Sequence, residues 1–564
     1  MRLSFLLAFL LLFGVPASAG YVAENGAIRL ISGNHGMRTI LEKFDDLFAA
    51  SHPGAKIRLE FNRLGNSINI PSIAYGTTLL APMGREAMPA ELLPFRQAVG
   101  SAPLVIRFAH GTLLSQDKAA PLAIYVNKAN PLEKLTMGQI ERIFTSGAAG
   151  GDITRWGQLG LEDAWAPLAI HTYGTPEISG FGFYMLQQKM HGRTFRPGYE
   201  AFPLAAQIVK RVGEDVGGIG FAALGFLTPE VKLVPVAEEA GGPYSAGGED
   251  DVINGRYPLD RYVYFYLRDA NDPLARDYVS LVLSSEGQRI IAEEKGGFLP
   301  LNSAEIAEEI AKLRAPAPPV DAPVAAAIIG DDRMAAVVDA LNALFHGEHP
   351  EISLSVSLKG PSTGIAGLTA GVSLLAPMAR EAWPVEIEPF KRLTGFEPID
   401  IHIGRIGKDL PGVYVNAANP LSGLSFDQMM QIFSQASLSR WSQLGWSDRA
   451  IHLYGPRDDG KFASTLMKDR PFAPNYEAVA DPLAAAAADR FGIALAEQGS
   501  SIKGVKRVLP LPVFLRFYVA NPSDPMVAEF LRLALSAKGQ AAIRALGYLP
   551  LEADEISGEL SKLQ

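Results

Sequence analysis

The chain has 564 residues, of which 48% are hydrophobic and 20% charged, and its formal net charge at pH 7 is −9. This composition is typical of a soluble globular protein, and the length predicts three or four compact units of roughly 150 residues each. The negative charge argues against nucleic acid or an anionic membrane surface as a general partner. Because the sequence contains no cysteine, disulfides and lipid attachment to an N-terminal cysteine are excluded.

The first residues, MRLSFLLAFLLLFGVPASAG, have the composition of an export signal. One Arg precedes an apolar run from Leu3 to Val15, and Ala17-Ser18-Ala19 is a small-residue cleavage site. A transmembrane anchor is the alternative, but this run is too short to span a bilayer comfortably. We expect residues 1–19 to be removed. The mature protein is then periplasmic, with secretion as the second choice, and has no stable membrane insertion.

Short apolar strands alternate with helical patterns after this signal. Ala27–Ser32 predicts a strand, and the apolar residues of Met37–Ala50 recur at helical spacing. Ile57–Phe61 predicts the next strand, and Tyr262–Leu267 predicts a further buried strand. Such alternation predicts an α/β fold with mainly parallel sheets that are covered on both faces.

The second half of the chain repeats the first. Four pairs of segments match in the same order: LLAPMGREAMPAELLPF with LLAPMAREAWPVEIEPF, YVNKANPL with YVNAANPL, RWGQLG with RWSQLG, and HTYG with HLYG. The offset falls only from 295, between Leu79 and Leu374, to 281, between His171 and His452. Solenoid repeats are far shorter, at roughly 20–50 residues, so each copy must have its own core.

The elements of the first copy recur in the second at Ala326–Ile329, Met334–Phe345, Ile352–Leu358 and Phe514–Val519. Residues 314–323 are rich in proline and alanine and predict a semi-rigid linker between the copies. We therefore expect a signal at 1–19, a first domain at 20–313, the linker at 314–323 and a second domain at 324–564.

Three strand-to-helix turns in each copy combine glycine with polar residues. Ligands of open α/β sheets bind at the carboxyl ends of strands. Glycine lets backbone N–H groups face a ligand, and a helix N-terminus adds partial positive charge, so such turns suit an anion. One turn alone is more often an ordinary cap, but three that recur favour a binding cleft. The candidates are Asn34 and His35 (first turn), Gly65, Asn66 and Ser67 (second turn) and Ser179 and Gly180 (third turn), with Ser362, Thr363, Gly364, Arg457 and Gly460 in the second copy.

Arg85 and Arg380 occupy the same place in the repeat and are further candidates. A guanidinium group can hold an oxyanion through two parallel hydrogen bonds. The alternative is an ion pair with the adjacent Glu86 or Glu381.

Other repeated residues are expected to be structural. His171 and His452 precede the third turn, where satisfied histidines are commoner than ligands. Trp156 and Trp441 are expected to pack in a core. The HGEH segment of the second copy has no counterpart in the first, so we expect no metal site there.

These segments resemble the phosphate-binding protein of bacterial phosphate ABC transporters, over nearly the whole of each copy. The resemblance rests on the order of the turns, LLAPM-x-RE, YVN-x-ANPL, the following helix and the late strand YPLDRYVYFYL. It implies two tandem periplasmic-binding-protein-like domains of type II, each with two α/β lobes and a cleft between them. It also implies a ligand held by backbone N–H groups and hydroxyls of the three turns, together with an Arg and an Asp. Ser67, Ser179-Gly180 and Ser362-Thr363 are the positions that match the hydroxyl-bearing turns.

The second copy departs further from the family pattern than the first. Phe181 follows Ser179-Gly180 where the family has a hydroxyl, whereas the second copy has lost the hydroxyls of that turn altogether. Its first and third turns carry the carboxylates Asp331, Asp332, Asp458 and Asp459. Carboxylates that face a bound dianion are unfavourable unless they are protonated or paired. The alternative is that they cap helices and face solvent. We expect the first copy to bind the anion more tightly.

The first hypothesis is a periplasmic solute-binding protein that captures a small oxyanion, phosphate first, for an ABC permease or for sensing, without a cofactor. The second is a degenerate tandem scaffold with a sensory or interaction role and at most one working site. An enzyme such as a secreted phosphatase is disfavoured, because the sequence shows no nucleophile motif or metal cluster.

Overall fold

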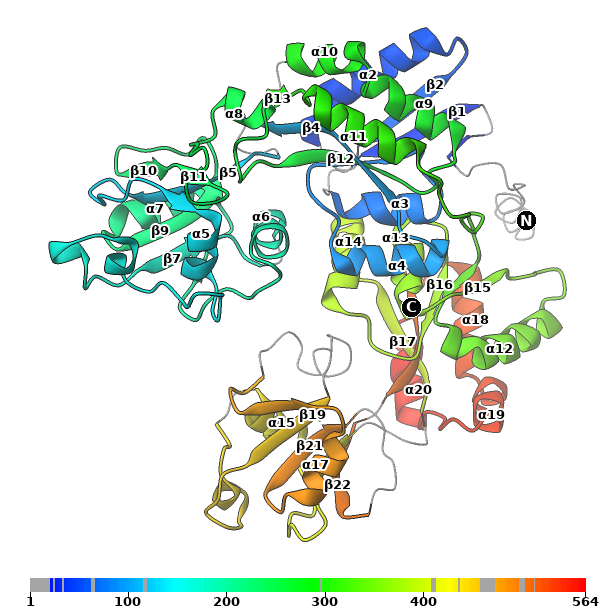
Figure 1. Ribbon diagram of the computed structural model, residues 1–564. Helices are drawn as coiled ribbons and strands as arrows, with labels where there is room; N and C mark the ends of the chain where they lie inside the picture. Colours follow the sequence, from blue (N-terminus) through cyan, green and yellow to red (C-terminus); the bar gives the residue numbers. More distant parts are fainter. Residues whose placement is uncertain are drawn as a thin grey trace. The chain divides into compact units, whose positions relative to one another are not determined.

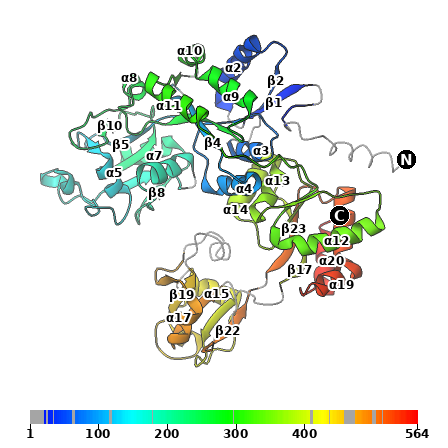
Figure 2. The same cartoon turned by 45° about the vertical axis from the view of Figure 1, so that its right-hand side comes forward.

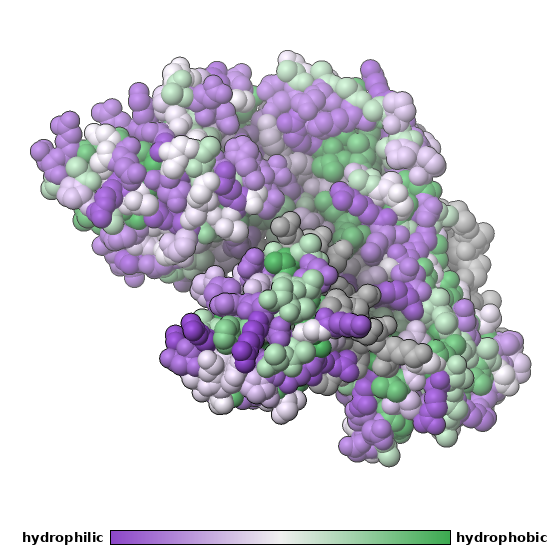
Figure 3. Space-filling model, turned by 60° about the horizontal axis from the view of Figure 1, so that its bottom comes forward, coloured by the Kyte–Doolittle hydropathy of each residue, from purple (hydrophilic) through white to green (hydrophobic). Residues whose placement is uncertain are grey.

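The computed structural model describes residues 21–563, apart from 24–25, 33–34, 62–65, 115–118, 178, 295–296, 407–411, 435–436, 457–471, 497–502 and 512 and the side chains of 35 and 510. The chain forms two compact units, Met1–Val324 and Ala325–Gln564 (Figure 1). Each unit contains two large hydrophobic cores, one for each of its two lobes. Polar side chains cover much of the surface seen in Figure 3, with smaller apolar areas among them, while the large apolar residues are gathered in internal cores.

The first lobe of the first unit has helices on both sides of its strands (Figures 1 and 2). Its elements are β1 (Ala27–Ser32), α2 (Arg38–Ser51), β2 (Lys56–Phe61), α3 (Asn69–Ala74), β3 (Ala81–Met83), α4 (Pro89–Val99), β4 (Leu104–Thr112), β12 (Tyr262–Leu267), α9 (Pro273–Val282), α10 (Ser285–Glu293), β13 (Phe298–Leu299) and α11 (Ser303–Arg314). Strands β1 and β2 are parallel, whereas the order β13-β4-β12-β3 is antiparallel throughout. Phe44 and Phe48 lie on one face of α2 and reach the core beside Phe108 and Phe265.

The second lobe is a five-stranded mixed sheet with the order β10-β5-β9-β7-β8. Its elements are β5 (Leu122–Asn127), β6 (Leu135–Thr136), α5 (Met137–Phe144), β7 (His171–Gly174), α6 (Gly180–Tyr184), β8 (Glu200–Ala201), α7 (Ala205–Glu214), β9 (Gly218–Ala223), β10 (Val231–Val234), β11 (Val236–Ala237) and α8 (Glu249–Ile253). A π-helical turn, Met185–Lys189, extends α6. Trp156 is completely buried in this core, as predicted.

Two chain segments cross between these lobes, one from β4 to β5 and one from α8 to β12. They lie side by side, because the Gly111 N–H donates to the Arg261 carbonyl at 2.7 Å and the Leu122 N–H donates to the Leu259 carbonyl at 3.0 Å. Paired crossing segments of this kind are the natural place for a hinge between two lobes.

The second unit repeats this arrangement. Its first lobe has the strand order β15-β14-β16-β23-β17 and its second lobe the order β20-β19-β21-β18-β22. Its elements are β14 (Ile328–Gly330), α12 (Ala335–Glu348), β15 (Val356–Leu358), α13 (Pro361–Thr369), β16 (Leu375–Met378), α14 (Pro384–Thr394), β17 (Ile399–Arg405), β18 (Gly412–Asn416), α15 (Phe426–Phe433), β19 (His452–Pro456), β20 (Tyr476–Val479), α17 (Pro482–Ala488), β21 (Gly492–Ala496), β22 (Val505–Pro510), β23 (Phe514–Val519), α18 (Pro525–Leu535), α19 (Ala537–Ala545) and α20 (Ala553–Ser561).

The predicted α/β class is confirmed, and the sheets contain both parallel and antiparallel pairs. The antiparallel share is larger than expected, because the crossing strands β12 and β23 return against the direction of their neighbours. The predicted strand at Ile352–Leu358 is shorter, since β15 includes only Val356–Leu358.

Candidate functional site

Several predicted ligand positions lie outside the described residues. These are Asn34, Gly65, Arg457 and Gly460. His35 begins a 3-10 turn, His35–Met37, that leads into α2, but its side chain is also outside the description. The geometry of the site therefore comes from the second and third turns and from the LLAPM segment.

The second turn of the first unit is joined to the end of β3. Ser67 lies in the 3-10 turn Asn66–Ile68 and is only 7% exposed. The Asn66 side-chain oxygen accepts a long hydrogen bond, 3.4 Å, from the Gly84 N–H. The Asn69 amide donates to the Pro82 carbonyl at 2.5 Å. These bonds hold the turn against the segment that carries Arg85.

Ser179 and Gly180 form the N-terminus of α6. The Ser179 hydroxyl caps the helix by accepting from the Gly182 N–H at 3.0 Å. A Cβ on Gly182 would lie 2.1 Å from the Pro176 carbonyl oxygen, so this position tolerates only glycine without a shift of the backbone. The predicted turn is thus a tight helix cap, with its first N–H groups at the helix end that carries partial positive charge.

Arg85 forms an ion pair, but its partner is Glu91 and not the adjacent Glu86. Both terminal nitrogens of Arg85 lie 2.7 Å from the Glu91 oxygens, and Nη1 also donates to the Glu86 carbonyl at 2.8 Å. Burial disfavours the charged guanidinium, but Glu91 outweighs this and holds the pKa of Arg85 above its usual value. Glu91 is the third residue of α4, and its carboxylate also accepts the Met88 N–H as part of the helix cap. This cap holds the carboxylate where Arg85 can reach it.

The structure brings Arg85 of the first lobe together with the third turn of the second lobe. A Cβ placed on Gly180 would lie 3.1 Å from Cδ of Arg85. Two residues that are 95 positions apart in the sequence therefore meet within one unit. This contact brings the cap of α6 from the second lobe against the aliphatic part of a side chain of the first lobe, so that a ligand at this turn could be held by both lobes.

Arg261 is a residue that the sequence analysis missed. It immediately precedes β12, is 2% exposed, and its guanidinium lies over the rings of Phe181 and Tyr184 in α6. In the sequence, Arg261 directly precedes the apolar strand YVYFYL. This position alone does not show whether the arginine is buried or exposed.

The second unit reproduces the arginine pair. Both terminal nitrogens of Arg380 lie 2.7 Å from Glu386, and Nη2 donates to the Ser362 hydroxyl at 3.1 Å. The Thr363 hydroxyl donates to the Gly360 carbonyl at 2.6 Å, and Gly364 packs against the wall of the sheet, where a Cβ would lie 3.0 Å from Ala376. Arg380, Ser362 and Thr363 thus use hydrogen bonds to other groups of the second unit.

Asp331 of the second unit caps the 3-10 turn Asp332–Met334, as the capping alternative expected, but it does not face solvent. Its carboxylate is completely buried and is bound by the Arg333 guanidinium at 2.8–3.2 Å. It also accepts the N–H groups of Arg333 and Ala379, each at 3.0 Å. Burial raises the pKa of this carboxyl, but the Arg333 and Ala379 hydrogen bonds outweigh it and hold the pKa below its usual value. An internal carboxylate therefore takes up the Arg333 N–H of the first turn and the Ala379 N–H of the LLAPM segment. The neighbouring Asp332 is exposed, as predicted.

The two repeated histidines are structural, as predicted. His171 Nδ1 lies 2.7 Å from Asp215 Oδ2, and His452 Nδ1 lies 2.6 Å from Asp489 Oδ2. In each case a tyrosine of the same strand donates to the same carboxylate. Within the described ranges, no three His, Asp or Glu side chains are placed to hold a metal ion, and no helix has the length and apolar composition needed to cross a membrane.

Comparison with known proteins gives a consistent family. A family model described as the PBP superfamily domain matches residues 119–286. The phosphate-binding protein PstS of Pseudomonas aeruginosa is 31% identical over 306 residues, which are 53% of this chain and 90% of that protein. Phosphate-binding protein PstS 2 of Streptococcus pneumoniae is 23% identical over 237 residues, which are 42% of this chain and 72% of that protein.

Solved structures of the same kind are also similar. An ABC-type phosphate transport receptor from Vibrio cholerae has 20% identity and a TM-score of 0.34, and the match covers 48% of this chain and 98% of that one. A phosphate ABC transporter substrate-binding protein from Clostridium perfringens has 22% identity and a TM-score of 0.31, with 49% and 100% covered.

Each unit has two α/β lobes, and in the first unit two paired segments cross between them, which is the architecture of two-lobed solute-binding proteins. The chain belongs to the family of PstS-like binding proteins.

Proposed function

We propose that the first unit binds a small oxyanion, phosphate first, between its two lobes. The observation that carries this proposal is the meeting of Arg85 from the first lobe with the Ser179-Gly180 turn from the second. A ligand held by groups of both lobes favours the closed arrangement, because contacts to each lobe are made together only there. Similarity to proteins named as phosphate-binding supports phosphate over other oxyanions.

We further propose that the protein is exported to the periplasm and passes its ligand to an ABC-type permease or to a signalling partner. The signal-like residues 1–19 support export. The relatives are named as binding proteins, which supports binding and not catalysis as the activity.

The second unit is proposed to bind the same anion weakly or not at all. Asp331 already fills donors of its first turn, so an external oxyanion would have to displace a buried carboxylate that is paired with Arg333. This observation also supports the alternative for that unit, a scaffold with a sensory or interaction role.

The test is calorimetric titration of the mature chain, residues 20–564, with phosphate, sulfate, molybdate and a small carboxylate. We expect one phosphate per chain. Ser179→Asp should abolish binding, because a carboxylate would then face the anion at the helix N-terminus. Ser284→Asp is the matched control, since Ser284 caps α10 in the same way, accepting from Gly287 at 3.2 Å. Binding that survives Ser179→Asp would show that the site is misplaced, and no binding of any oxyanion by the wild-type chain would favour the scaffold.

A further inference from the structure

Arg85 has little donor capacity left for a ligand. Both of its terminal nitrogens are bound to Glu91, and one also binds the Glu86 carbonyl. The same two-point pair recurs between Arg380 and Glu386, in the unit whose first turn is filled by its own carboxylate. A geometry that persists in both units is explained by the support it gives to the LLAPM segment. The cation that holds an oxyanion should therefore be sought elsewhere.

Arg261, unlike Arg85, has a buried donor that no described residue uses. It is 2% exposed, its guanidinium carbon lies 4.9 Å from the ring centre of Phe181, and it lies 5.2 Å from that of Tyr184. Phe181 directly follows Gly180, so the guanidinium lies at the third turn. Among the described residues its guanidinium has one polar contact, from Nη2 to Glu86 at 3.5 Å, and its buried Nε has no acceptor. A buried donor without an acceptor is unfavourable, and an oxyanion at this place would supply one.

The charges around Arg261 also suit an anion. Glu86, the carboxylate at its guanidinium, is shared with the Tyr264 hydroxyl, which donates to it at 2.7 Å. The carboxylate of Asp260 accepts the Arg261 backbone N–H at 2.7 Å and also binds His110. A second cation lies nearby, because Lys189 Nζ is 5.7 Å from the ring centre of Tyr184. Burial lowers the pKa of Lys189, and the nearby carboxylates Glu238, Asp260 and Glu86 offset this only in part. Glu86 and Asp260 thus each bind a further donor besides Arg261, and Lys189 adds a second basic side chain beside Tyr184.

The second unit has no cation at this position, although its strand β23 carries another buried arginine, Arg516, which is paired with Asp400 and whose Nε also has no acceptor. Tyr262 and Phe514 open the matching strands β12 and β23, so the residue before them is Arg261 in the first unit and Val513 in the second. The unit that has an arginine at this position is therefore the one without a buried carboxylate, such as Asp331, at its first turn.

We infer that Arg261 is the cation that holds the oxyanion in the first unit, through its Nε–H and a terminal N–H, while Arg85 supports the site from its ion pair with Glu91. The planar guanidinium can present two parallel donors to one oxyanion, and the rings of Phe181 and Tyr184 fix its plane. This inference rests on the proposed binding of an oxyanion by the first unit.

The direct test follows the Nε–H signal of Arg261 by 1H–15N NMR in the mature chain during titration with inorganic phosphate. The signal is assigned by its loss in Arg261→Lys. We expect it to shift and to saturate at the dissociation constant found by calorimetry. Because this measurement uses the unmodified side chain, it does not depend on whether a variant folds.

Variants give the second test. Arg261→Val copies the residue of the second unit and should weaken phosphate binding by roughly 100-fold, and Arg261→Lys by roughly 10-fold, since lysine keeps the charge but loses the fork. Arg256→Gln is the control, because Arg256 is an exposed arginine of the same segment paired with Asp251, and it should leave affinity unchanged. Phosphate binding without a shift of the Arg261 signal, or with full affinity in folded Arg261→Val, overturns the inference and leaves the proposed function standing. A wild-type chain that binds no phosphate overturns both.

Discussion

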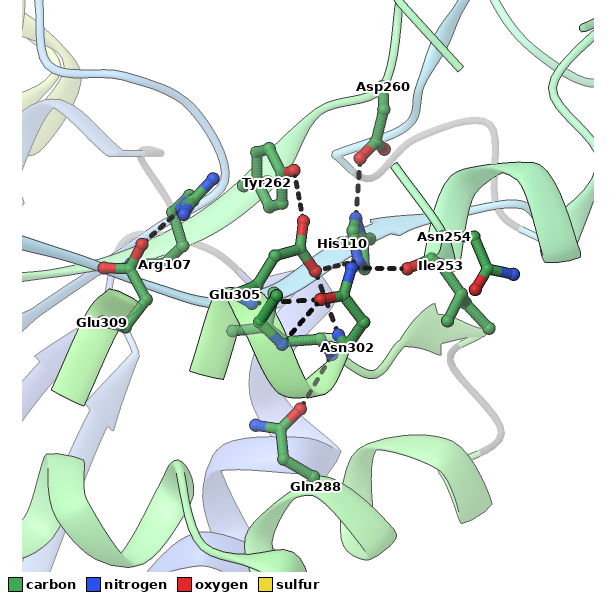
Figure 4. Close-up of polar contacts among 12 residues, drawn as sticks. Arg107, His110, Ile253, Asn254, Asp260, Tyr262, Gln288, Asn302, Glu305 and Glu309 are labelled. Atoms are coloured by element: carbon green, nitrogen blue, oxygen red, sulfur yellow. Dashed lines mark hydrogen bonds and ion pairs between the residues drawn. The ribbon is translucent and has the colours of Figure 1, made fainter. Parts of the chain in front are cut away.

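His110 Nδ1 lies 2.6 Å from Asp260 Oδ2, and these two residues belong to the two chain segments that lead across between the lobes of the first unit. His110 is completely buried, and its Nε2 lies 3.1 Å from Glu305 at the start of α11 (Figure 4). The Tyr262 hydroxyl donates to the other oxygen of Glu305 at 2.6 Å. One imidazole therefore joins both crossing segments to a helix of the first lobe.

The second unit exchanges the basic residues of this cluster. His110 and Arg107 of β4 bind Glu305 and Glu309 of α11. In the second unit Arg405 stands where His110 does and binds Glu555, and His402 stands where Arg107 does and lies 3.3 Å from Glu559. A basic residue is thus kept at both places, but only in the first unit is the residue at the crossing a histidine.

The first prediction concerns pH. Burial disfavours the imidazolium of His110, but its bonds to Asp260 and Glu305 outweigh this and raise its pKa to about 9 from an ordinary 6.5. A raised pKa means that the stabilisation is complete below pH 6.5 and is lost as pH rises through 9. The loss for the first unit should be at most about 3 kcal/mol.

Calorimetric melting between pH 6 and 10 tests this by comparing wild type with His110→Gln. The variant should unfold at lower temperature near pH 6, and the difference should shrink as pH rises. His191→Gln is the control, because His191 is exposed and pairs with Glu141 at 3.0 Å. A difference that stays constant across this range would show that His110 is not charged in the folded protein.

The second prediction concerns Asp331. Replacement by Ala removes the acceptor of two backbone N–H groups and of Arg333, and should lower the free energy of unfolding of the second unit at pH 7 by about 2–3 kcal/mol. Because the pKa of Asp331 is lowered, its contribution is present above pH 3.8 and is lost as pH falls further. Asp332→Ala, at the exposed neighbour, should have almost no effect, and an equal loss in both variants would contradict the assignment.

The third prediction concerns Gly180. Its Cβ would lie 3.1 Å from Arg85, whose side chain is held by Glu91 and cannot move freely. Gly180→Ala should therefore weaken phosphate binding by roughly 10-fold, about 1.4 kcal/mol, while the fold is kept. Gly138→Ala in α5 is the control, since nothing lies within 4 Å of its Cβ, and it should stabilise the protein slightly. An unchanged affinity for phosphate in Gly180→Ala would show that Gly180 does not lie at the binding site.

The fourth prediction concerns the boundary between the units. Helix α11 ends at Arg314, and the chain then runs without regular structure to β14. The end of this stretch is attached to the first unit, because the Asp321 N–H donates to Val99 at 3.1 Å and the Arg268 guanidinium binds the Asp321 carbonyl. Because Arg314 is exposed at the end of α11, trypsin should cut after it and leave two stable fragments, which denaturing electrophoresis would separate. Mass spectrometry identifies the cut, and fragments that end elsewhere would move the boundary.

The elements that the sequence predicted well are those whose apolar residues are all local. The period of Met37–Ala50 and the apolar runs at Ala27–Ser32 and Tyr262–Leu267 correspond to α2, β1 and β12. Strand direction was less accessible, because parallel and antiparallel buried strands have the same composition. The third turn of the first unit was also located correctly, since Ser-Gly before a helix is a local capping signal.

Ion pairs and hydrogen bonds between residues far apart in the sequence could not be predicted from local patterns. The sequence placed Glu86 beside Arg85, but helix geometry brought Glu91 to it as the third residue of α4. It read Asp331 as a solvent-facing cap, but the Ala379 N–H and the Arg333 side chain made it a buried one. It gave no sign that Arg261 is buried, because that depends on α6 packing over it.

The sequence by itself indicated the duplication, the α/β class, the family resemblance and the turns that suit an anion. Each of these depends on local composition or on the match between the two halves of the chain. Only the tertiary structure decided which charges neutralise one another. Burial and pairing depend on residues that are far apart in the chain, such as His110 with Asp260 and Arg85 with Gly180. A buried charge is stabilised by the groups that folding places around it, and this decides which cation remains available to a ligand.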